Sequence, residues 1–390
     1  MHNAFIVGAV RTAAGKRRGK LSKHHPIDLG GAVLDELIRR TGIDPATVED
    51  VIFGCVNQVG SQGTNIARNA VLSSCLPESV PATTVDRQCG SSQQAVHFAA
   101  QAVMSGVHDV VIAGGVEVMS LVPIGGNAIA GHKQGYGAPY GQGMKERYPG
   151  VRWSQFEGAE MLAQKRNLDR ASLDAFGYAS HAKAARATKE GRFEREIMPV
   201  EVSSEDGGRE SFRVDEGIRY EASLEAMAGL EPLSRIGLLT AGTSSQISDG
   251  AAALLIANED GLAKLAKKPR ARIRAMTIAG DDPVVMLSAP IPATHKLLAR
   301  TGMKLGDIDL YEVNEAFASV PLAWAQEFDA DQERLNVNGG AIALGHPLGC
   351  TGAKLMTTLL HELERRDAKL GLQTMCEGGG LANATLLERV

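Results

Sequence analysis

The chain has 390 residues, which corresponds to two or three domains of ordinary size. Its formal net charge of -4 at pH 7 argues against wholesale binding of nucleic acid or of an anionic membrane surface. The sequence holds 44 glycines but only 15 prolines, a combination that favours tight turns and close backbone packing over disorder.

Five cysteines lie far apart, at positions 55, 75, 89, 350 and 376. Their odd number and the lack of a C-x-x-C pair argue against a disulfide scaffold or a zinc ribbon, and a reduced, cytoplasmic compartment fits best. No signal peptide is visible, and no apolar run approaches the roughly 18–20 residues of a membrane span. We therefore expect no membrane insertion and, without a metal-spaced ligand cluster, no metal.

The first 120 residues alternate short apolar strands with helices that have one apolar side. We expect strands at 4–10, 51–54, 82–85 and 109–113, with helices at 27–40, 65–72 and 91–104 between them. Such alternation predicts an α/β fold with much parallel sheet.

The pattern is interrupted by a long segment of different character. Residues 121–150 contain eight glycines and three prolines and are expected to form a functional or interface loop. A helical, charged stretch at 156–186 and a polar, irregular stretch at 191–219 follow. We expect 121–245 to be a loop domain inserted into a core half built from 1–120 and 246–270.

Alternating strand and helix signals return at 271, and part of the first half's pattern recurs. Cys89-Gly-Ser-Ser opens a helix that a strand and two glycines follow. Gly349-Cys-Thr-Gly opens a helix through Arg366, followed by a strand and the turn Cys376-Glu-Gly-Gly-Gly. The recurrence predicts that 271–390 is a second half similar to the first, with matching elements near a pseudo-twofold axis.

Cys89 stands between an expected strand end and a helix start. The positive end of the helix dipole and its free N–H groups would lower the pKa of the thiol and favour the thiolate, the nucleophilic form. The alternative is a small buried hydrophobic residue, the commoner role of a cysteine.

Three further positions carry comparable signals. His346, among glycines and beside Pro347, would be held as a base for a thiol, or it is an ordinary surface histidine. Cys376 precedes three glycines whose N–H groups would form an oxyanion hole, or it is a buried strand-end residue. Asn314 follows an expected strand at 308–313 and would hold a water or a substrate oxygen, or it caps a helix.

Taken together, the sequence resembles the thiolase family over essentially its whole length. The matching stretches are Arg11-Thr, Thr84-Val-Asp-Arg-Gln-Cys-Gly-Ser, Ala113-Gly-Gly-Val-Glu-Val-Met-Ser, Thr240-Ala-Gly-Thr-Ser-Ser-Gln-Ile-Ser-Asp-Gly-Ala-Ala-Ala, Asn314-Glu-Ala-Phe-Ala, Asn338-Gly-Gly-Ala-Ile-Ala-Leu-Gly-His-Pro-Leu-Gly and Cys376-Glu-Gly-Gly-Gly. The resemblance implies two similar βα-layered halves, an α/β/α/β/α sandwich, with an inserted loop domain that binds coenzyme A and serves oligomerisation.

The resemblance also implies a ping-pong reaction of two CoA thioesters. Cys89 would take up the acyl group, His346 would accept its proton, and Cys376 would move a proton at the acetyl-CoA methyl group. Asn314, through a water, and His346 would form one oxyanion hole, and the N–H groups of Cys89 and Gly378 the other.

Four residues match family positions that contact coenzyme A, which is expected as a substrate with no permanently bound cofactor. Arg219 would lie near the nucleotide end and Ser245 near the pantetheine amide, while Met286 and Phe317 would line the pantetheine or acyl pocket. Arg219 could instead be a solvated arginine, and Met286 and Phe317 plain core residues. The family further implies a homodimer or a homotetramer built through the loop at 121–150.

One departure from the family pattern bears on the substrate. Short-chain biosynthetic members have His-Met-Gly in the loop domain, whereas this chain reads Trp153-Ser-Gln-Phe-Glu-Gly-Ala-Glu. We therefore expect a degradative 3-ketoacyl-CoA thiolase of lipid or steroid side-chain catabolism. It would cleave its substrate to acetyl-CoA, or propionyl-CoA, and a shortened acyl-CoA, or run the reverse condensation. A biosynthetic acetoacetyl-CoA thiolase is the alternative.

Three other hypotheses come from different classes. A decarboxylating ketosynthase or chalcone-synthase relative would lack a second catalytic cysteine, so Cys376 argues against it. An inactive CoA-binding scaffold is disfavoured because all four reactive positions are intact. A redox role, in which Cys89 and Cys376 form a disulfide, stays open although C-x-x-C spacing is absent.

Overall fold

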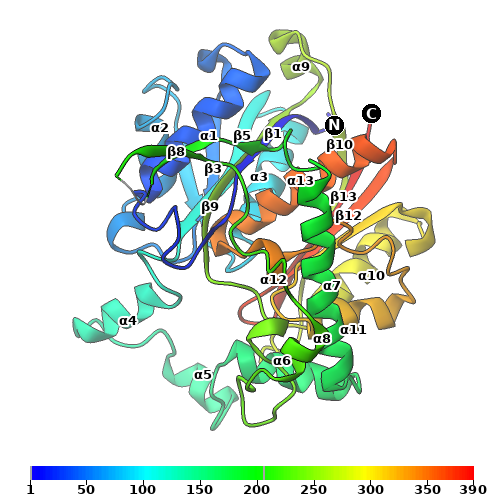
Figure 1. Cartoon of the computed structure of the whole chain (residues 1–390). Helices are drawn as coiled ribbons and strands as arrows, with labels where there is room; N and C mark the ends of the chain where they lie inside the picture. The colour runs from blue at the N-terminus through cyan, green and yellow to red at the C-terminus, as the bar shows by residue number, and fades with distance from the viewer. Residues whose placement is uncertain (1, 205–206) are drawn as a thin grey trace.

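The computed structural model describes residues 2–204 and 207–390, and its largest feature is a mixed sheet of eleven strands (Figure 1). The main path has the order β11-β12-β13-β10-β1-β9-β5-β3-β4, and β2 and β6 pair with β9 and β1 beside it. The strands are β1 Phe5–Thr12, β2 Gly15–Lys16, β3 Asp50–Gly54, β4 Ala82–Val85, β5 Val110–Val118, β6 Ile197–Met198, β9 Ser248–Ala257, β10 Ala271–Gly280, β11 Leu310–Val313, β12 Leu370–Glu377 and β13 Leu381–Arg389.

The main path joins an N-terminal and a C-terminal group of strands. They meet where β1 pairs antiparallel with β10 at Phe5 and Ile6 only. Among the N-terminal strands, β3 pairs parallel with β4 and β5, and β9 lies antiparallel between β5 and β1. Every residue of β5 and β9 is buried, which explains why both strands read as almost continuous apolar runs.

Two long helices form the layer between the groups of strands. α3 (Ser91–Ser105) contacts β3 and β5, whereas α13 (Thr351–Arg366) contacts β9 and β12, and the two helices pack against each other. The outer helices include α1 (Pro26–Thr41), which begins at a proline, where no intrahelical N–H bond is lost, and ends at Gly42 in the left-handed conformation. The remaining core helices are α2 Ile66–Leu72, α9 Glu259–Leu265, α10 Pro290–Thr301, α11 Ser319–Phe328 and α12 Ala341–Leu344.

The segment between β5 and β9 is more regular than its composition predicts. Residues 121–150, expected to be a loop, contain α4 and α5 and extend away from the body (Figure 1). Strands β6 to β8 lie in the stretch at 191–219 that was expected to be irregular. The sequence did not indicate β7 and β8 because they pair through alternating residues and contain no apolar run. The elements are α4 Gly126–Lys133, α5 Gln142–Arg147, α6 Gln155–Lys165, α7 Arg170–Lys189, β7 Val200–Ser203, β8 Arg209–Phe212 and α8 Leu224–Ala228.

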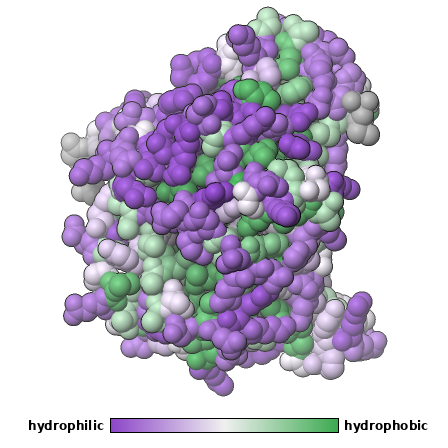
Figure 2. Space-filling model, turned by 90° about the vertical axis from the view of Figure 1, so that its right-hand side faces the viewer, coloured by the Kyte–Doolittle hydropathy of each residue, from purple (hydrophilic) through white to green (hydrophobic). Residues whose placement is uncertain are grey.

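Polar residues cover most of the face shown in Figure 2, with smaller apolar areas between them. Within the described ranges, no helix combines the length and the apolar character needed to cross a lipid bilayer.

A buried cluster of ion pairs ties the inserted segment to β1. Arg11, in β1, is fully buried and pairs with Glu196 at 2.6 Å and with Asp215 at 2.8 Å. Asp215 also accepts the N–H of Ala14, and Glu196 accepts the hydroxyl of Thr358 in α13. Both carboxylates are therefore paired directly with one guanidinium, which joins three parts of the chain, and the charge of Lys354 adds a weaker, more distant attraction.

We expect replacement of Arg11 by methionine to lower the free energy of unfolding by about 3–5 kcal/mol, because Glu196 and Asp215 would lose their counter-ion while staying buried. Urea unfolding of the variant and of the unmodified protein measures the difference. A loss below about 1 kcal/mol, the usual value of a surface pair, would contradict this account.

Candidate active site

Cys89 lies in the tight turn between β4 and α3. Gln88, just before it, adopts the left-handed conformation with φ of 48°, which is costly for a residue with a side chain and turns the chain sharply into the helix. The Cys89 side chain is half-buried and packs against Val56, Met119 and Leu348. Since Leu348 is two residues beyond His346, this packing brings the segments of the two residues together.

The sequence predicts a lowered pKa for Cys89, and this prediction is wrong for the resting structure. Burial and the nearby carboxyl of Glu377 raise the pKa of the thiol to about 12, although the N–H groups of Cys89 and Gly378 act in the opposite direction. The helix start is present, but desolvation outweighs it. The thiol is therefore protonated at rest and needs a base when it reacts.

His346 is buried in a turn, and the side chain of Thr351 orients its imidazole ring. Its Nδ1 atom lies 2.6 Å from the hydroxyl oxygen of Thr351, and that hydroxyl donates its only proton to the carbonyl of Pro347 at 2.8 Å. The Thr351 oxygen can therefore only accept from the ring, so Nδ1 carries the proton. Nε2 is left as a free lone pair, which is the form that a general base needs.

Asn314 faces this lone pair. Its Nδ2 lies 3.4 Å from Nε2 of His346, and its buried Oδ1 has no protein partner among the described residues. The alternative that Asn314 caps a helix is wrong, because α11 begins only at Ser319. Burial, together with the charge of Lys354, lowers the pKa of His346 to about 3, so the ring is neutral and able to accept a proton.

Cys376 and Gly378 approach Cys89 from the end of β12. The charge of a Cys89 thiolate raises the pKa of Cys376, which burial already raises well above its usual value. Gly378 adjoins Gln88, since a β-carbon on this glycine would lie 3.1 Å from Oε1 of Gln88. The structure thus brings Cys89, Cys376 and the Gly378 N–H together at one end of the sheet.

Glu117 joins the loops of the site, and the sequence analysis assigned it no role. Five N–H groups donate to its buried carboxylate at 2.8–3.2 Å, from Val56, Asn57 (backbone and side chain), Gln62 and Gly349. Gly349 has no room for a side chain, because a β-carbon would lie 2.7 Å from Oε2 of Glu117 and 2.6 Å from Cys55. The sequence feature that could have indicated this role is the position of a glutamate near the end of an otherwise apolar strand.

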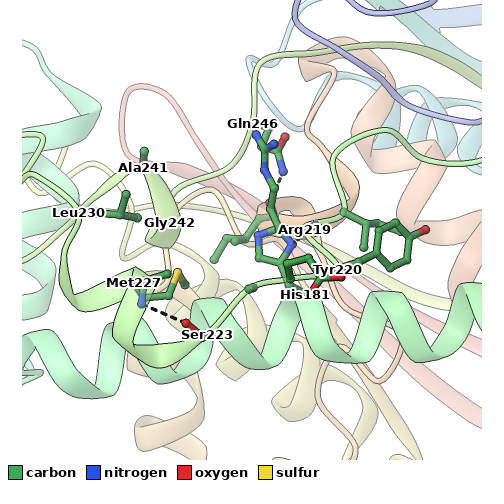
Figure 3. Close-up of a pocket in the computed structure, with 14 residues that line it drawn as sticks. His181, Arg219, Tyr220, Ser223, Met227, Leu230, Ala241, Gly242 and Gln246 are labelled. Carbon is green, nitrogen blue, oxygen red and sulfur yellow. Dashed lines mark hydrogen bonds between the residues drawn. The ribbon is translucent and has the colours of Figure 1, made fainter.

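Arg219 lies elsewhere, at a cavity of about 730 Å³ (Figure 3). Its backbone N–H donates to Nδ1 of His181, whose pKa falls to about 4 through burial and the charge of Arg219. Tyr220, Met227 and Leu230 add apolar surface to the cavity. It therefore combines an exposed cation, Arg219, and an exposed carboxylate, Glu221, with an apolar wall.

The segment Thr240–Gln246 connects this cavity to the catalytic candidates. Gln246 lines the cavity, and its carbonyl accepts the N–H of His346 at 3.3 Å. Ser245 donates its N–H to the carbonyl of Ala316, two residues after Asn314, at 2.9 Å. One short segment thus borders the cavity, His346 and the Asn314 loop.

Phe317 and Met286, expected at the acyl pocket, both adjoin α6. The Phe317 ring meets Phe156 edge to face with centroids 5.5 Å apart. Gly158 packs against Met286, which has φ of 64°. Both residues are buried, so the core-packing alternative also describes them. In residues 2–204 and 207–390, no group of three His, Cys, Asp or Glu side chains is placed to hold a metal ion.

We expect Thr351→Val to lower thiolase turnover, the activity that the resemblance predicts, by about tenfold, the value of one net hydrogen bond. Valine cannot accept from Nδ1 of His346, so the ring can rotate or change tautomer. Steady-state kinetics measure the loss, and Thr351→Ser should restore turnover. The matched control is Thr357→Val, which removes a buried hydroxyl that bonds only within α13; an equal loss in this control would refute the orienting role.

Comparison with known proteins identifies the family of the chain. Residues 4–260 match the family model "Thiolase, N-terminal domain", and residues 267–389 match "Thiolase, C-terminal domain". A steroid 3-ketoacyl-CoA thiolase, FadA6, from Mycobacterium tuberculosis is 52% identical over 100% of this chain and 95% of its own. A 3-ketoacyl-CoA thiolase from Aliivibrio salmonicida is 44% identical, with both chains fully covered.

The fold comparison leads to the same family. The crystal structure of the Bacillus anthracis acetyl-CoA acetyltransferase superposes with a TM-score of 0.90 at 36% identity, covering 100% of this chain and 99% of that one. The predicted thiolase-like α/β fold is therefore confirmed. The chain belongs to the thiolase family and is an acyltransferase.

Proposed function

We propose that the protein is a degradative thiolase that cleaves a 3-ketoacyl-CoA with coenzyme A. The observation that carries the proposal is two neutral groups, a protonated Cys89 thiol and a His346 ring whose Nε2 is unprotonated and faces Nδ2 of Asn314 at 3.4 Å. Relatives named 3-ketoacyl-CoA thiolase, which match over the full chain, support the same activity.

In the first half-reaction, Cys89 Sγ attacks the 3-keto carbon while His346 Nε2 accepts the thiol proton. The carbon–carbon bond of the tetrahedral adduct then breaks, leaving an acyl group on Cys89 and the enolate of acetyl-CoA. His346 and a water held by Asn314 stabilise the enolate oxygen, and Cys376 protonates the methylene carbon. The free Oδ1 of Asn314 supports the assignment of that water.

In the second half-reaction, the thiol of coenzyme A attacks the acyl-cysteine. The backbone N–H groups of Cys89 and Gly378 stabilise the oxyanion. Both N–H groups act to lower the pKa of the Cys89 thiol, which supports this role because N–H groups with this effect point toward the reacting atoms. Cys376, left as a thiolate by the first half-reaction, accepts the thiol proton of coenzyme A, and the leaving Cys89 thiolate regains its proton from His346. The shortened acyl-CoA then departs. The two thioesters use one site in turn, as a ping-pong reaction requires.

We assign coenzyme A to the cavity beside Arg219. Arg219 is exposed where it lines this cavity, next to Glu221, and its guanidinium would pair with the phosphates of the nucleotide. Gln246, which also lines the cavity, accepts the N–H of His346 with its carbonyl. Ser245 adjoins that inward path. Coenzyme A enters as a substrate, and the proposal includes neither a permanently bound cofactor nor a metal.

For the acyl group, we propose a bulky lipid or steroid side-chain substrate. Phe156, in the stretch that departs from the short-chain pattern, meets Phe317 and lines a cavity of about 610 Å³ together with Leu233 and Ile236. The aromatic and aliphatic part of this lining suits a large apolar group, while Arg152, Glu157 and Arg235 line the rest of the cavity. The name of the steroid-specific relative at 52% identity agrees with this choice.

A short-chain acetoacetyl-CoA thiolase is the second candidate, favoured by the fold match to an acetyl-CoA acetyltransferase. The thiolase family models set aside the ketosynthase hypothesis and the inactive scaffold. The cysteines carry free thiols in this structure, so the Cys89–Cys376 disulfide stays a hypothesis.

We further propose a homodimer or homotetramer in the cytoplasm. The arm formed by α4 and α5 has no buried residue in either helix and exposes Ile129, Tyr136 and Met144, which a second copy would cover. The five free cysteines support a reducing compartment.

The central test is acylation of Cys89. We expect intact-mass measurement to show one added acyl group after mixing with a 3-ketoacyl-CoA, and its loss on adding coenzyme A. The Cys89→Ala variant should acquire no acyl group and lose thiolysis by at least about 1,000-fold, the scale seen when a nucleophile is removed. Acylation of the alanine variant, or none of the unmodified protein by any chain length, would refute the proposal.

Substrate size is tested through Phe156. We expect Phe156→Ala to lower kcat/KM for steroid side-chain or long-chain 3-ketoacyl-CoA by about tenfold or more, since it removes a large apolar contact, and to affect acetoacetyl-CoA less. A thiolysis panel from acetoacetyl-CoA to steroid thioesters measures the ratio. If acetoacetyl-CoA is the best substrate of the unmodified protein by a wide margin, the short-chain candidate replaces this one.

A further inference from the structure

Glu377 is a buried acid next to the site that the mechanism does not use. It is the last residue of β12, directly after Cys376, and successive strand residues point to opposite faces. Its side chain turns toward the start of α3, where Oε1 lies 1.9 Å from the point that a β-carbon on Gly90 would occupy. The residue has no exposed surface, and only a glycine after Cys89 leaves room for its carboxyl group.

The oxygens of this carboxyl group lack donors. Across the residues that the structure describes, no donor makes a well-aligned hydrogen bond to either oxygen of Glu377, and the backbone N–H of Asn383 in β13 is only near enough to lower the pKa of the acid. Among the same residues, Oδ1 of Asn383 also has no hydrogen-bond partner. Oδ1 of Asn383 lies 2.2 Å from the same point beside Gly90, so both oxygens border the same small space. A carboxylate and an amide oxygen can both only accept, whereas a protonated carboxyl would donate to the amide oxygen.

The groups around Glu377 provide little compensation for a negative charge. The turn before α3 contributes one cation, Arg87, and the thiols of Cys89 and Cys376 lie on the other side. From α3 come the amide of Gln94, which accepts from Asn383, and His97, whose pKa falls to about 3. Burial raises the pKa of Glu377 to about 8, against the weaker effects of Arg87 and the Asn383 N–H.

We propose that Glu377 is a positioning residue for Cys89 that carries a proton in the resting protein and donates it to Oδ1 of Asn383. This inference rests on the proposed function, in which Cys89 is the nucleophile. While neutral, Glu377 fills the space beside Gly90 without opposing a thiolate. When it loses its proton, its charge acts directly on Cys89 and Cys376, and the thiolate becomes harder to form.

The test uses the pH dependence of Cys89 alkylation by iodoacetamide, with peptide mass mapping to separate it from exposed Cys75. Glutamine in Glu377→Gln keeps the shape of the neutral acid but cannot ionise. The rate ratio of this variant to the unmodified protein should rise by about threefold or more between about pH 6.5 and pH 9, as Glu377 loses its proton in the unmodified protein alone. The matched control is Asp86→Asn in the same turn, whose ratio should stay constant.

A constant ratio for Glu377→Gln overturns the proposal: a constant value near one means no coupling, and a constant value above one means a permanent carboxylate. Infrared difference spectra of the unmodified protein provide a second measurement that needs no folded variant. They should show the carbonyl stretch of a protonated carboxylic acid at about pH 6.5 that decreases by about pH 9, and its absence also overturns the proposal. Neither measurement uses an acyl-CoA, so failure of the proposed thiolysis is seen separately in the acylation experiment.

Discussion

The carboxylate of Glu117 is the contact on which the site depends. It lies at the end of β5, between the loop after β3 and the turn that follows His346, and it satisfies N–H groups from both. Those N–H groups are buried, so without the carboxylate each would remain unsatisfied at a cost of about 1–3 kcal/mol. The strands belong to the N-terminal part of the chain and the turn to the C-terminal part. One side chain thus links the two parts at the place where the segment of Cys89 packs against the segment that follows His346.

The resting site keeps both reacting groups uncharged. A thiolate–imidazolium pair would need water or strong counter-charges, and burial around Cys89 and His346 supplies neither. Proton transfer therefore has to accompany attack on the substrate, when the developing oxyanion meets the N–H donors prepared for it. Burial then favours the reaction, because the same N–H donors stabilise the oxyanion more strongly in a site that excludes water.

Much of this could be predicted from the sequence, because the signals were local. Helix α3 begins at Ser91, as expected from the turn at Cys89, and α13 ends at Arg366, the expected bound of the helix that follows Gly349-Cys-Thr-Gly. The fold class followed from alternating elements and the family motifs. The pKa of Cys89 did not follow, because desolvation depends on what packs over the thiol, namely Val56, Met119 and Leu348 from three distant segments. The roles of Glu117 and Thr351 were missed for the same reason, since their partners meet only in the folded chain.

The glycine hairpin after Cys376 has a consequence for how such a site tolerates change. The N–H of Gly378 belongs to the main chain, so among the side-chain exchanges at that position only one to proline would delete the donor while the hairpin keeps its shape. Gly379 and Gly380 both have positive φ, and that shape is therefore encoded by the absence of β-carbons. Sequence drift can reshape the acyl pocket around Phe156 while this part of the chemistry is inherited through backbone geometry alone.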